Sequence, residues 1–231
     1  MADLLLVHGS CHGAWCWRDA IPALERLGHE ARAIDLPSHG RDDTPVETVT
    51  LQGYAQAIVE ALGSSTVLVG HSMAGFPITR AAQLAPGRIA RLVYLCAYVP
   101  IPGMALSEMR RLSERQPLIE AIRKAPDGLT MTIDPEMAVE KFYHDCAPDT
   151  AAWAVSMLGP QPLAPQETPF PDAPPPDLPR SYVLCEDDHA VPVELQERFC
   201  DGWDSVARLP TSHSPFLSAP DRLAGTIDAM L

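Results

Sequence analysis

The sequence predicts an α/β fold in which a mostly parallel sheet of about six strands is flanked by helices. Short apolar runs such as Leu4–Val7 and Val67–Val69 are continuous rather than alternating, which is typical of strands buried on both faces of a parallel sheet. Amphipathic helical stripes lie between these runs, and strands that alternate with helices indicate a doubly wound sheet. The chain of 231 residues is 46% hydrophobic, which suits one compact domain.

The predicted elements follow one another along most of the chain. The first strand, Leu4–Val7, precedes a helical stripe that runs from Trp17 to Leu27 at three- and four-residue spacing. The remaining elements are a helix at 51–62, strands at 67–69 and 92–95, a strand at 181–185, a helix around 195–199, a short strand at 206–209 and a last helix that ends near Leu231.

Residues 100–177 interrupt this alternation and separate two core segments, 1–99 and 178–231. From Ile101 to about Phe170 the chain is rich in Met, Glu and Arg and lacks a buried strand run, which predicts short helices in an inserted helical cap. Seven prolines between Pro165 and Pro179 then exclude a helix or central strand. They predict a stiff linker that returns the chain to the sheet.

Charge and cysteine usage limit the partners and the compartment. The formal charge is −13, from 30 acidic and 17 basic side chains, so the chain repels nucleic acid and anionic membranes, and we expect neither as a partner. The N-terminal apolar run stops at His8, too early for a signal peptide or a membrane span, and the expected location is cytoplasmic. Six cysteines without C-x-x-C pairs are expected to be free thiols.

The segment 69–75, V-G-H-S-M-A-G, leads from a predicted strand into a predicted helix. A serine hydroxyl becomes an effective nucleophile on a tight turn that exposes its oxygen between small neighbours. Gly70 and Ala74 are small, although the usual G-x-S-x-G pattern has Gly where this chain has Ala74. Ser72 is therefore the predicted nucleophile.

A seryl nucleophile needs a base and an acid, which this kind of fold supplies in the order Ser, acid, His. His213 lies in a loop between the last predicted strand and the last helix, and is the predicted base. The acid is expected after the preceding strand, where Glu186, Asp187 and Asp188 are candidates. Spacing alone does not choose between Asp187 and Asp188.

Backbone N–H groups are expected to stabilise the negative charge that develops on the substrate carbonyl oxygen. Each such donor is worth on the order of 3 kcal/mol. One donor should be Met73, directly after the nucleophile, and the second should come from the glycine-containing loop 8–13, with the N–H of Ser10 as the candidate.

These motifs resemble one branch of the α/β-hydrolase superfamily, namely the plant methylesterase and hydroxynitrile lyase group with its bacterial esterase relatives. The resemblance covers most of the chain and is weakest in the predicted cap. It rests on segments 6–17, 35–40, 69–75, 185–192 and 213–216. In this group the triad acid lies three places after the Cys and four before the Pro, which selects Asp188, and the second oxyanion donor falls on Ser10. The resemblance also implies about six strands, starting at the strand before the His-Gly loop.

Ester hydrolysis and cyanohydrin cleavage both remain open, because one triad serves both reactions in this group. The resembling lyases carry Thr at the position of Gly9 and Lys at the position of Ser214, where a cation stabilises departing cyanide. The only lysines here, Lys124 and Lys141, fall in the predicted cap. We therefore favour a serine carboxylesterase that acts on small, largely apolar esters through an acyl-enzyme on Ser72. The alternatives are a lyase and a small-molecule receptor that retains a hydrolase triad.

Cap residues are expected to close an apolar pocket over the triad. Phe142, Trp153 and Met157 are candidates for substrate binding, and His12 is a candidate polar contact; each has a purely structural role as its alternative. The expected partner is a small-molecule ester, and the mechanism implies no metal or organic cofactor. A homodimer is a further expectation, from the resemblance.

Overall fold

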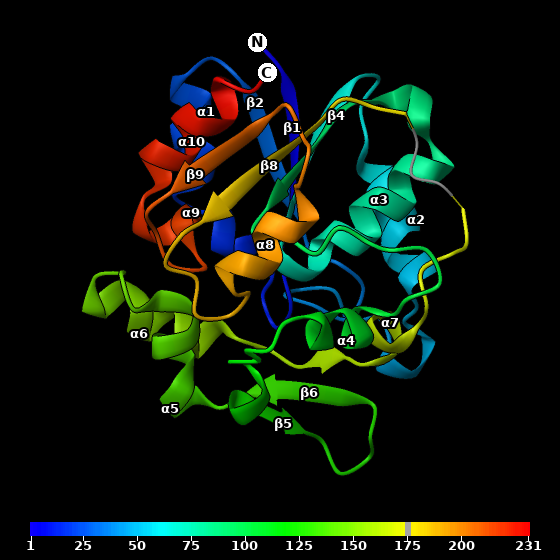
Figure 1. The fold of residues 1–231 in the computed structure, drawn as a ribbon, viewed down its shortest axis with the longest axis vertical. Coiled ribbons are helices and arrows are strands. Elements are labelled where there is room, and N and C mark those ends of the chain that lie inside the picture. Colours follow the sequence, from blue (N-terminus) through cyan, green and yellow to red (C-terminus); the bar gives the residue numbers. More distant parts are fainter. Residues whose placement is uncertain (174–176) are drawn as a thin grey trace.

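A six-stranded parallel sheet forms the centre of the computed structural model, which describes residues 1–173 and 177–231 (Figure 1). Its strands are β1 (Asp3–Val7), β2 (Glu30–Ile34), β3 (Thr66–His71), β4 (Ile89–Leu95), β8 (Arg180–Cys185) and β9 (Val206–Leu209). They lie in the order β2-β1-β3-β4-β8-β9, and every neighbouring pair is parallel. The predicted α/β fold with about six strands is confirmed. All carboxyl ends of the strands meet at one edge of the sheet.

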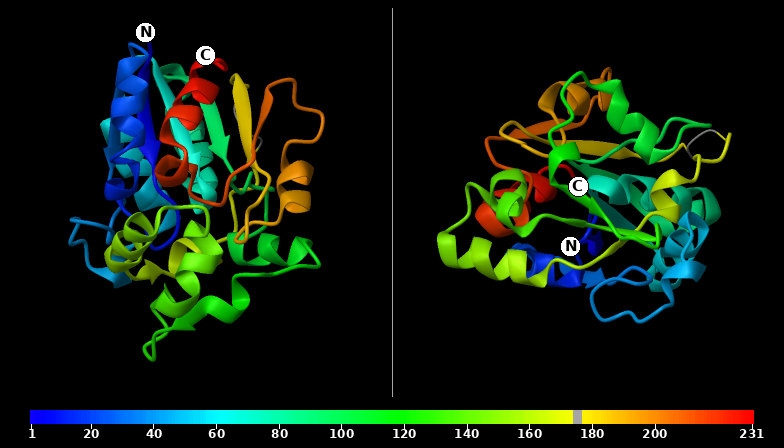
Figure 2. Two further views of the ribbon diagram at one scale, coloured as in Figure 1. Left: turned by 90° about the vertical axis from the view of Figure 1, so that its left-hand side faces the viewer. Right: turned by 90° about the horizontal axis from the view of Figure 1, so that it is seen from below.

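Helices cover both faces of this sheet (Figure 2). They are α1 (Ala20–Arg26), α2 (Leu51–Ala61), α3 (Gly75–Leu84), α8 (Val193–Phe199), α9 (Pro215–Ser218) and α10 (Pro220–Asp228). Leu5 of β1 packs in one core cluster with Ile58 of α2. The preceding Leu4 packs in a second cluster with Leu24 of α1 and Leu223 of α10. Because successive strand residues enter two separate cores, the strands read as continuous apolar runs.

The edge strand β2 is the strand of the main sheet that the apolar pattern does not predict. Its sequence, E-A-R-A-I, is only half-buried, since it has a neighbour on one side alone. Arg32 of β2 pairs with the Asp3 carboxylate of β1, so this edge of the sheet carries a charged pair rather than an apolar run.

The single helix predicted from Trp17 to Leu27 is divided into two elements. Trp17 ends a 3₁₀ turn, and α1 begins at Ala20.

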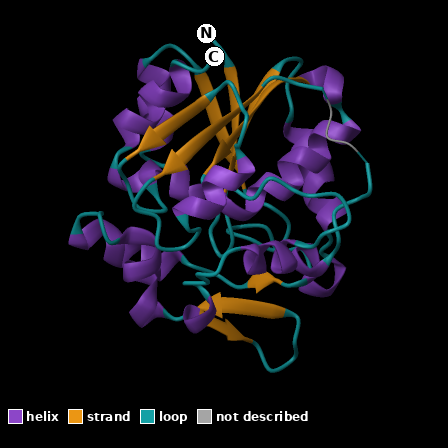
Figure 3. Ribbon diagram, viewed as in Figure 1, coloured by secondary structure: helices purple, strands orange, loops and turns teal. Residues whose placement is uncertain are grey.

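The segment between β4 and β8, which we call the cap segment, contains strands as well as helices. Its helices are α4 (Leu106–Met109), α5 (Pro135–Ala138), α6 (Pro148–Met157) and α7 (Ala164–Glu167). Between them lies an antiparallel sheet in the order β5-β6-β7, built from Ile122–Lys124, Thr130–Ile133 and Gln161–Pro162 (Figure 3). The expectation of helices alone was wrong.

The strands of the cap segment escape a pattern search because they are short and alternating. In β6 the side chains of Met131 and Ile133 are buried while Thr132 between them is exposed, and β5 and β7 are shorter still. Runs of two to four residues are too short to show a strand periodicity. The division into a core (1–99 and 178–231) and a cap (100–177) stays a prediction. The exclusion of a helix from Pro165 onward was wrong at its start, because Pro165 lies in the first turn of α7, where a missing N–H is tolerated. Pro174–Pro176 of the expected linker lie outside the described residues.

Short helical turns complete the fold. The 3₁₀ turns are η1 (Ala14–Trp17), η2 (Val46–Thr48), η3 (Ser72–Ala74), η4 (Pro86–Arg88), η5 (Arg110–Leu112) and η6 (Ile119–Ala121), and η7 (Val139–Tyr143) is a π turn. Nowhere in the described ranges is a helix both long and apolar enough to cross a membrane. The six cysteines are all free thiols. The cytoplasmic location stays a prediction.

Buried histidines support the loop that follows β1. His8 donates from Nδ1 to the carbonyl of Gly9 (2.9 Å) and accepts at Nε2 from the N–H of Leu36 (3.1 Å). Burial lowers the pKa of His8 to about 4 and that of His12 to about 3. Burial also holds the pKa of His39 and of His71 well below the ordinary value. These rings are therefore neutral structural groups at neutral pH.

We predict that acid destabilises the fold through these rings. A depressed histidine pKa means that the unfolded chain binds the proton first, so stability present above the unfolded pKa is lost as pH falls below it. For His8 the loss between pH 7 and pH 5 is about 2 kcal/mol. Urea unfolding at both pH values should therefore show that His8→Gln loses about 2 kcal/mol less than the wild type. Equal losses would contradict a neutral, buried His8.

Candidate active site

Sheet topology brings the three predicted triad residues to one edge. Ser72 directly follows β3, Asp188 lies three residues after β8, and His213 lies four residues after β9. In the parallel register Val7 pairs with Gly70, so the loop after β1 begins beside the turn that holds Ser72. Likewise Cys185 pairs with Leu209, and the loops of Asp188 and His213 leave the sheet together. Loops at the carboxyl ends of parallel strands are the usual place for a binding site in such folds.

Ser72 sits on a strained turn between β3 and α3. Its φ is 56°, in the left-handed region that non-glycine residues seldom adopt. Small neighbours make the turn possible: a Cβ on Gly70 would lie 2.7 Å from Ile78, and one on Gly75 would lie 2.0 Å from the backbone oxygen of Tyr98. The backbone of Tyr98 thus approaches the chain so closely at Gly75 that only a glycine fits there. The turn tolerates the methyl group of Ala74 at the preceding position.

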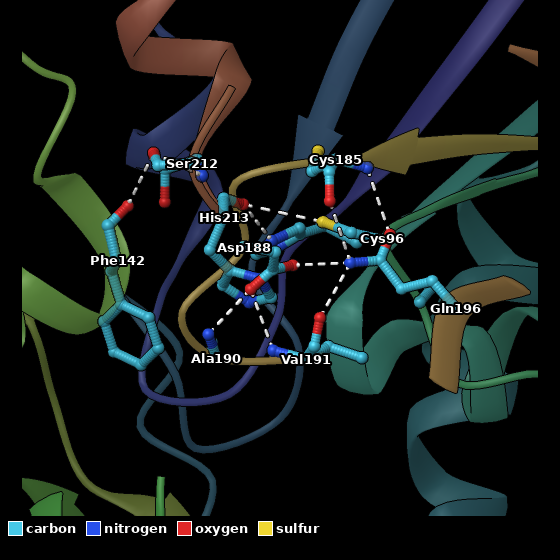
Figure 4. A network of polar contacts seen from close by, with 12 residues as sticks. Cys96, Phe142, Cys185, Asp188, Ala190, Val191, Gln196, Ser212 and His213 are labelled. Carbon is cyan, nitrogen blue, oxygen red and sulfur yellow. Dashed lines mark hydrogen bonds and ion pairs between the residues drawn. The ribbon is translucent and has the colours of Figure 1, made fainter. Parts of the chain in front are cut away.

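A buried carboxylate fixes the candidate base (Figure 4). Nδ1 of His213 donates to Oδ2 of Asp188 at 2.7 Å, and the two side chains are 2% and 0% exposed. The same oxygen accepts from Nε2 of Gln196 (3.0 Å), while Oδ1 accepts from the N–H groups of Ala190 (2.7 Å) and Val191 (2.8 Å). Because Nδ1 carries the proton, the neutral ring presents a lone pair at Nε2, which is the state that a general base needs.

The other two acid candidates point away from His213. The Asp187 side chain is 65% exposed and contacts His144 at 3.1 Å. Glu186 is also exposed and faces Arg208 at 3.7 Å. Among the three acids only Asp188 is buried against the imidazole, so the geometry agrees with the choice that the resemblance made.

The base lies against the residue that precedes the nucleophile. Nε2 of His71 donates to the carbonyl of His213 at 2.9 Å, and the two ring centroids are 4.5 Å apart. Within ranges 1–173 and 177–231, Ser72 Oγ makes no hydrogen bond to His213. Catalytic hydrogen bonds of this kind are often long in a free enzyme and tighten when substrate binds.

The loop after β1 touches the nucleophile. A Cβ on Gly9 would lie 2.7 Å from Nδ1 of His71 and 3.0 Å from Cβ of Ser72, so only a glycine fits without displacing the His71 ring. The next residue, Ser10, directs no N–H hydrogen bond to the described part of the chain, and the same holds for Met73. Both N–H groups are thus available to a substrate oxygen.

Two buried glutamines of the cap segment hold this loop, and sequence reasoning missed both. Gln166 donates from Nε2 to Oγ of Ser10 at 2.8 Å, and Oε1 of Gln161 accepts from the N–H of Cys11 at 3.4 Å. Arg110 donates in turn to Oε1 of Gln166. Gln161 is 0% exposed and Gln166 is 1% exposed. No motif marks them, because each contact spans about 150 residues of sequence.

The four predicted substrate-binding residues divide into two groups. Phe142 is buried with its ring 5.5 Å from that of His213, and so lies at the triad. His12 is close by, but Ser10 O and the Tyr143 hydroxyl occupy its two ring nitrogens at 2.7 Å each. It therefore acts as a brace for the loop rather than as a free polar contact.

Trp153 and Met157 lie elsewhere, so placing them over the triad was wrong. The Cζ atom of Arg18 lies 3.6 Å from the centre of the Trp153 ring. Trp153 also packs edge-on against the ring of Trp15. Met157 lines a groove of about 580 Å³ that His12 and Trp15 also line, together with residues of β2 and of the loop after it, and no triad residue is part of its wall. The reason is that α6 presents this side to the outer edge of the sheet rather than to β3.

A second cavity, of about 390 Å³, lies beside the loop of Ser10, since Gln166 forms part of its wall. Arg110 and Lys124 also line it, together with the apolar side chains of Ile122 and Met131. The Lys124 ammonium pairs with Glu167 at 3.5 Å. The other lysine, Lys141, pairs with Glu120 and Glu140 at 2.6 and 2.8 Å. Both lysines are thus engaged by carboxylates.

Comparison with known proteins agrees with this architecture. Residues 4–226 match the alpha/beta hydrolase family. The chain is 31% identical over 233 residues to alpha/beta hydrolase nvfD of Aspergillus novofumigatus, covering 94% of this chain and 92% of that one. It is 29% identical over 242 residues to methylesterase 1 of Arabidopsis thaliana, covering 95% and 92%. A solved pyrethroid hydrolase from Sphingobium faniae superposes with a TM-score of 0.87 at 27% identity, covering 99% and 96%.

These relatives are hydrolases and esterases, and the predicted branch is confirmed. The chain belongs to the alpha/beta hydrolase family, in the branch that holds the plant methylesterases.

Proposed function

We propose that the protein is a serine carboxylesterase that hydrolyses small, largely apolar carboxylic esters through an acyl-enzyme on Ser72. The observation that carries the proposal is the buried Asp188–His213 pair at the sheet edge that also holds the strained turn of Ser72. Such a pair is expensive to bury, and its geometry matches the needs of a base that acts on a serine hydroxyl. The esterase relatives support the same reaction class.

The mechanism follows from these positions. Nε2 of His213 takes the proton of Ser72 as Oγ attacks the ester carbonyl carbon, and the N–H groups of Ser10 and Met73 stabilise the oxyanion. Collapse of this intermediate breaks the bond to the alcohol oxygen, which receives the proton from His213, and leaves the acyl group on Ser72. Water then attacks the acyl carbon, gives its proton to His213 and releases the acid. Asp188 stays ionised throughout and stabilises the imidazolium.

Cyanohydrin cleavage has less support. A Thr side chain at position 9 would meet the His71 ring, as the 2.7 Å approach to Gly9 indicates. Ser214, which occupies the position of the lyase lysine, is completely buried and carries no charge. Lys124 and Lys141 are held by carboxylates. Arg110 donates to Gln166 on the wall of the neighbouring cavity, and its guanidinium does not occupy the position of the lyase lysine.

The first prediction concerns the nucleophile. Ser72→Ala should reduce the hydrolysis of a short-chain p-nitrophenyl ester at least about 10⁴-fold, because only binding and oxyanion stabilisation remain. Ser156→Ala, which removes an exposed hydroxyl of α6, is the matched control and should keep wild-type turnover. Turnover that survives Ser72→Ala in a folded protein would refute the mechanism.

The second prediction separates the three candidate functions. Incubated with mandelonitrile, the wild type should release no cyanide above the background rate, since the charge that stabilises this leaving group is missing. Cyanide electrode measurements with Ser72→Ala as a blank test this. Cyanide release without ester turnover would replace the esterase by a lyase, and slow turnover with tight product binding would favour a receptor.

The third prediction concerns Gln166, which we assign to positioning the loop of Ser10. Gln166→Ala should lower kcat for the same ester about tenfold with little change in KM, because a misplaced oxyanion donor acts on the transition state rather than on substrate binding. Gln56→Ala, which removes an exposed glutamine side chain of α2 that donates to Glu60, should leave kcat unaltered. A rise in KM alone would instead assign Gln166 to the pocket wall.

A further inference from the structure

A cluster of two histidines and one aspartate lies outside the triad, where the cap segment meets the loop of Asp188. His144 Nε2 is 3.1 Å from Oδ2 of Asp187, and His189 Nε2 is 3.4 Å from Oδ1 of the same carboxylate. The two ring centroids are 4.0 Å apart. The side chains of His144, Asp187 and His189 are 20%, 65% and 40% exposed, so the cluster is open to solvent. The proposed esterase mechanism uses none of them.

Glu140 orients both rings. Nδ1 of His144 lies 3.1 Å from the backbone oxygen of Glu140, and Nδ1 of His189 lies 3.0 Å from its carboxylate. A carbonyl and a carboxylate only accept hydrogen bonds, so each Nδ1 must carry a proton. A histidine held at one nitrogen by an oxygen of the protein, with the other nitrogen free to bind, is the usual arrangement around a metal.

With this arrangement the atoms at the centre of the cluster are all hydrogen-bond acceptors, and no proton lies between them. With the protons on Nδ1, each neutral ring presents a lone pair at Nε2, and both lone pairs face carboxylate oxygens that are also acceptors. A second proton on each ring would satisfy Asp187, but would place two positive rings in a stack at 4.0 Å. A single divalent cation between the three groups satisfies all the acceptors at once.

The distances match a small tetrahedral ion. Zinc binds nitrogen and oxygen at about 2.0–2.1 Å, so its ligand atoms lie about 3.3 Å from one another. The two Nε2 atoms lie 3.1 and 3.4 Å from the two oxygens of the Asp187 carboxylate, which is close to that value, and one ligand atom from each of the three residues lies within 4.8 Å of the others. We propose that His144, Asp187 and His189 form a binding site for a divalent transition metal, with zinc as the best fit and water as the fourth ligand.

The site joins two parts of the chain that are far apart in sequence. His144 follows η7 in the cap segment, whereas Asp187 and His189 flank Asp188 in the loop after β8. A bound ion would therefore fasten the cap segment to the loop that holds the candidate triad acid. The inference stands on this geometry and does not depend on the esterase proposal.

The test is a calorimetric titration of zinc chloride into the untagged, chelator-treated full-length protein. We expect one site in the wild type, and affinity weakened at least about tenfold in His189→Gln and in Asp187→Asn, since each loses one of three protein ligands. Glu186→Gln, which removes a neighbouring exposed carboxylate outside the cluster, is the matched control and should bind as the wild type does. Zinc should also raise the Tm of the wild type and the control but not of the two variants.

A second cluster supplies the competing explanation. His71, Cys96 and His213 also place potential ligand atoms within 4.8 Å of one another, although all three residues are buried. Titration with cobalt(II) distinguishes the two, because a thiolate ligand adds a near-ultraviolet charge-transfer band that a His₂Asp site lacks. Zinc affinity that persists in both variants, a thiolate band, or the absence of binding would each overturn the proposal. Two variants at different ligands ensure that misfolding of one leaves the test valid.

Discussion

The carboxylate of Asp188 is the group around which the carboxyl edge of the sheet is organised. A buried charge is costly unless every lone pair is satisfied, and here four donors do so: two backbone N–H groups, Gln196 and His213. These donors come from the loop after β8, from α8 and from the loop after β9. One side chain therefore dictates the path of two loops and the orientation of the imidazole, and removing it would leave several donors unsatisfied together.

Much of the fold could be predicted because a doubly covered parallel sheet leaves a clear signal. Apolar runs marked β1, β3, β4 and β8, since each of these strands enters a core on both faces, whereas the edge strand β9 was found from a shorter run of which only Leu209 is buried. The signal fails where that condition fails: β2 lies at the edge and is half-buried, and the strands of the cap segment are too short for periodicity to register. Burial, rather than strand propensity, decided which strands could be recognised.

The sequence predicted part of the candidate site in the same way as it predicted part of the fold. Ser72 and His213 follow from their places between strand and helix, while Asp188 needed the family resemblance, because its competitor Asp187 is adjacent in sequence and differs only in orientation. Trp153 and Met157 were misplaced because apolarity alone does not tell which side of α6 faces the triad. Gln161 and Gln166 left no signal at all, since their partners lie in the first loop of the chain.

Those two glutamines make the first loop of the chain depend on the cap segment. Both reach from the cap segment to the loop that carries Ser10 and Cys11, and each hydrogen bond joins residues about 150 positions apart in the sequence. The N–H of Ser10, the proposed oxyanion donor, is therefore held from a part of the chain that contains none of the proposed triad residues. Sequence changes in the cap segment that displace either glutamine would thus slow the reaction even though they leave Ser72, Asp188 and His213 unchanged.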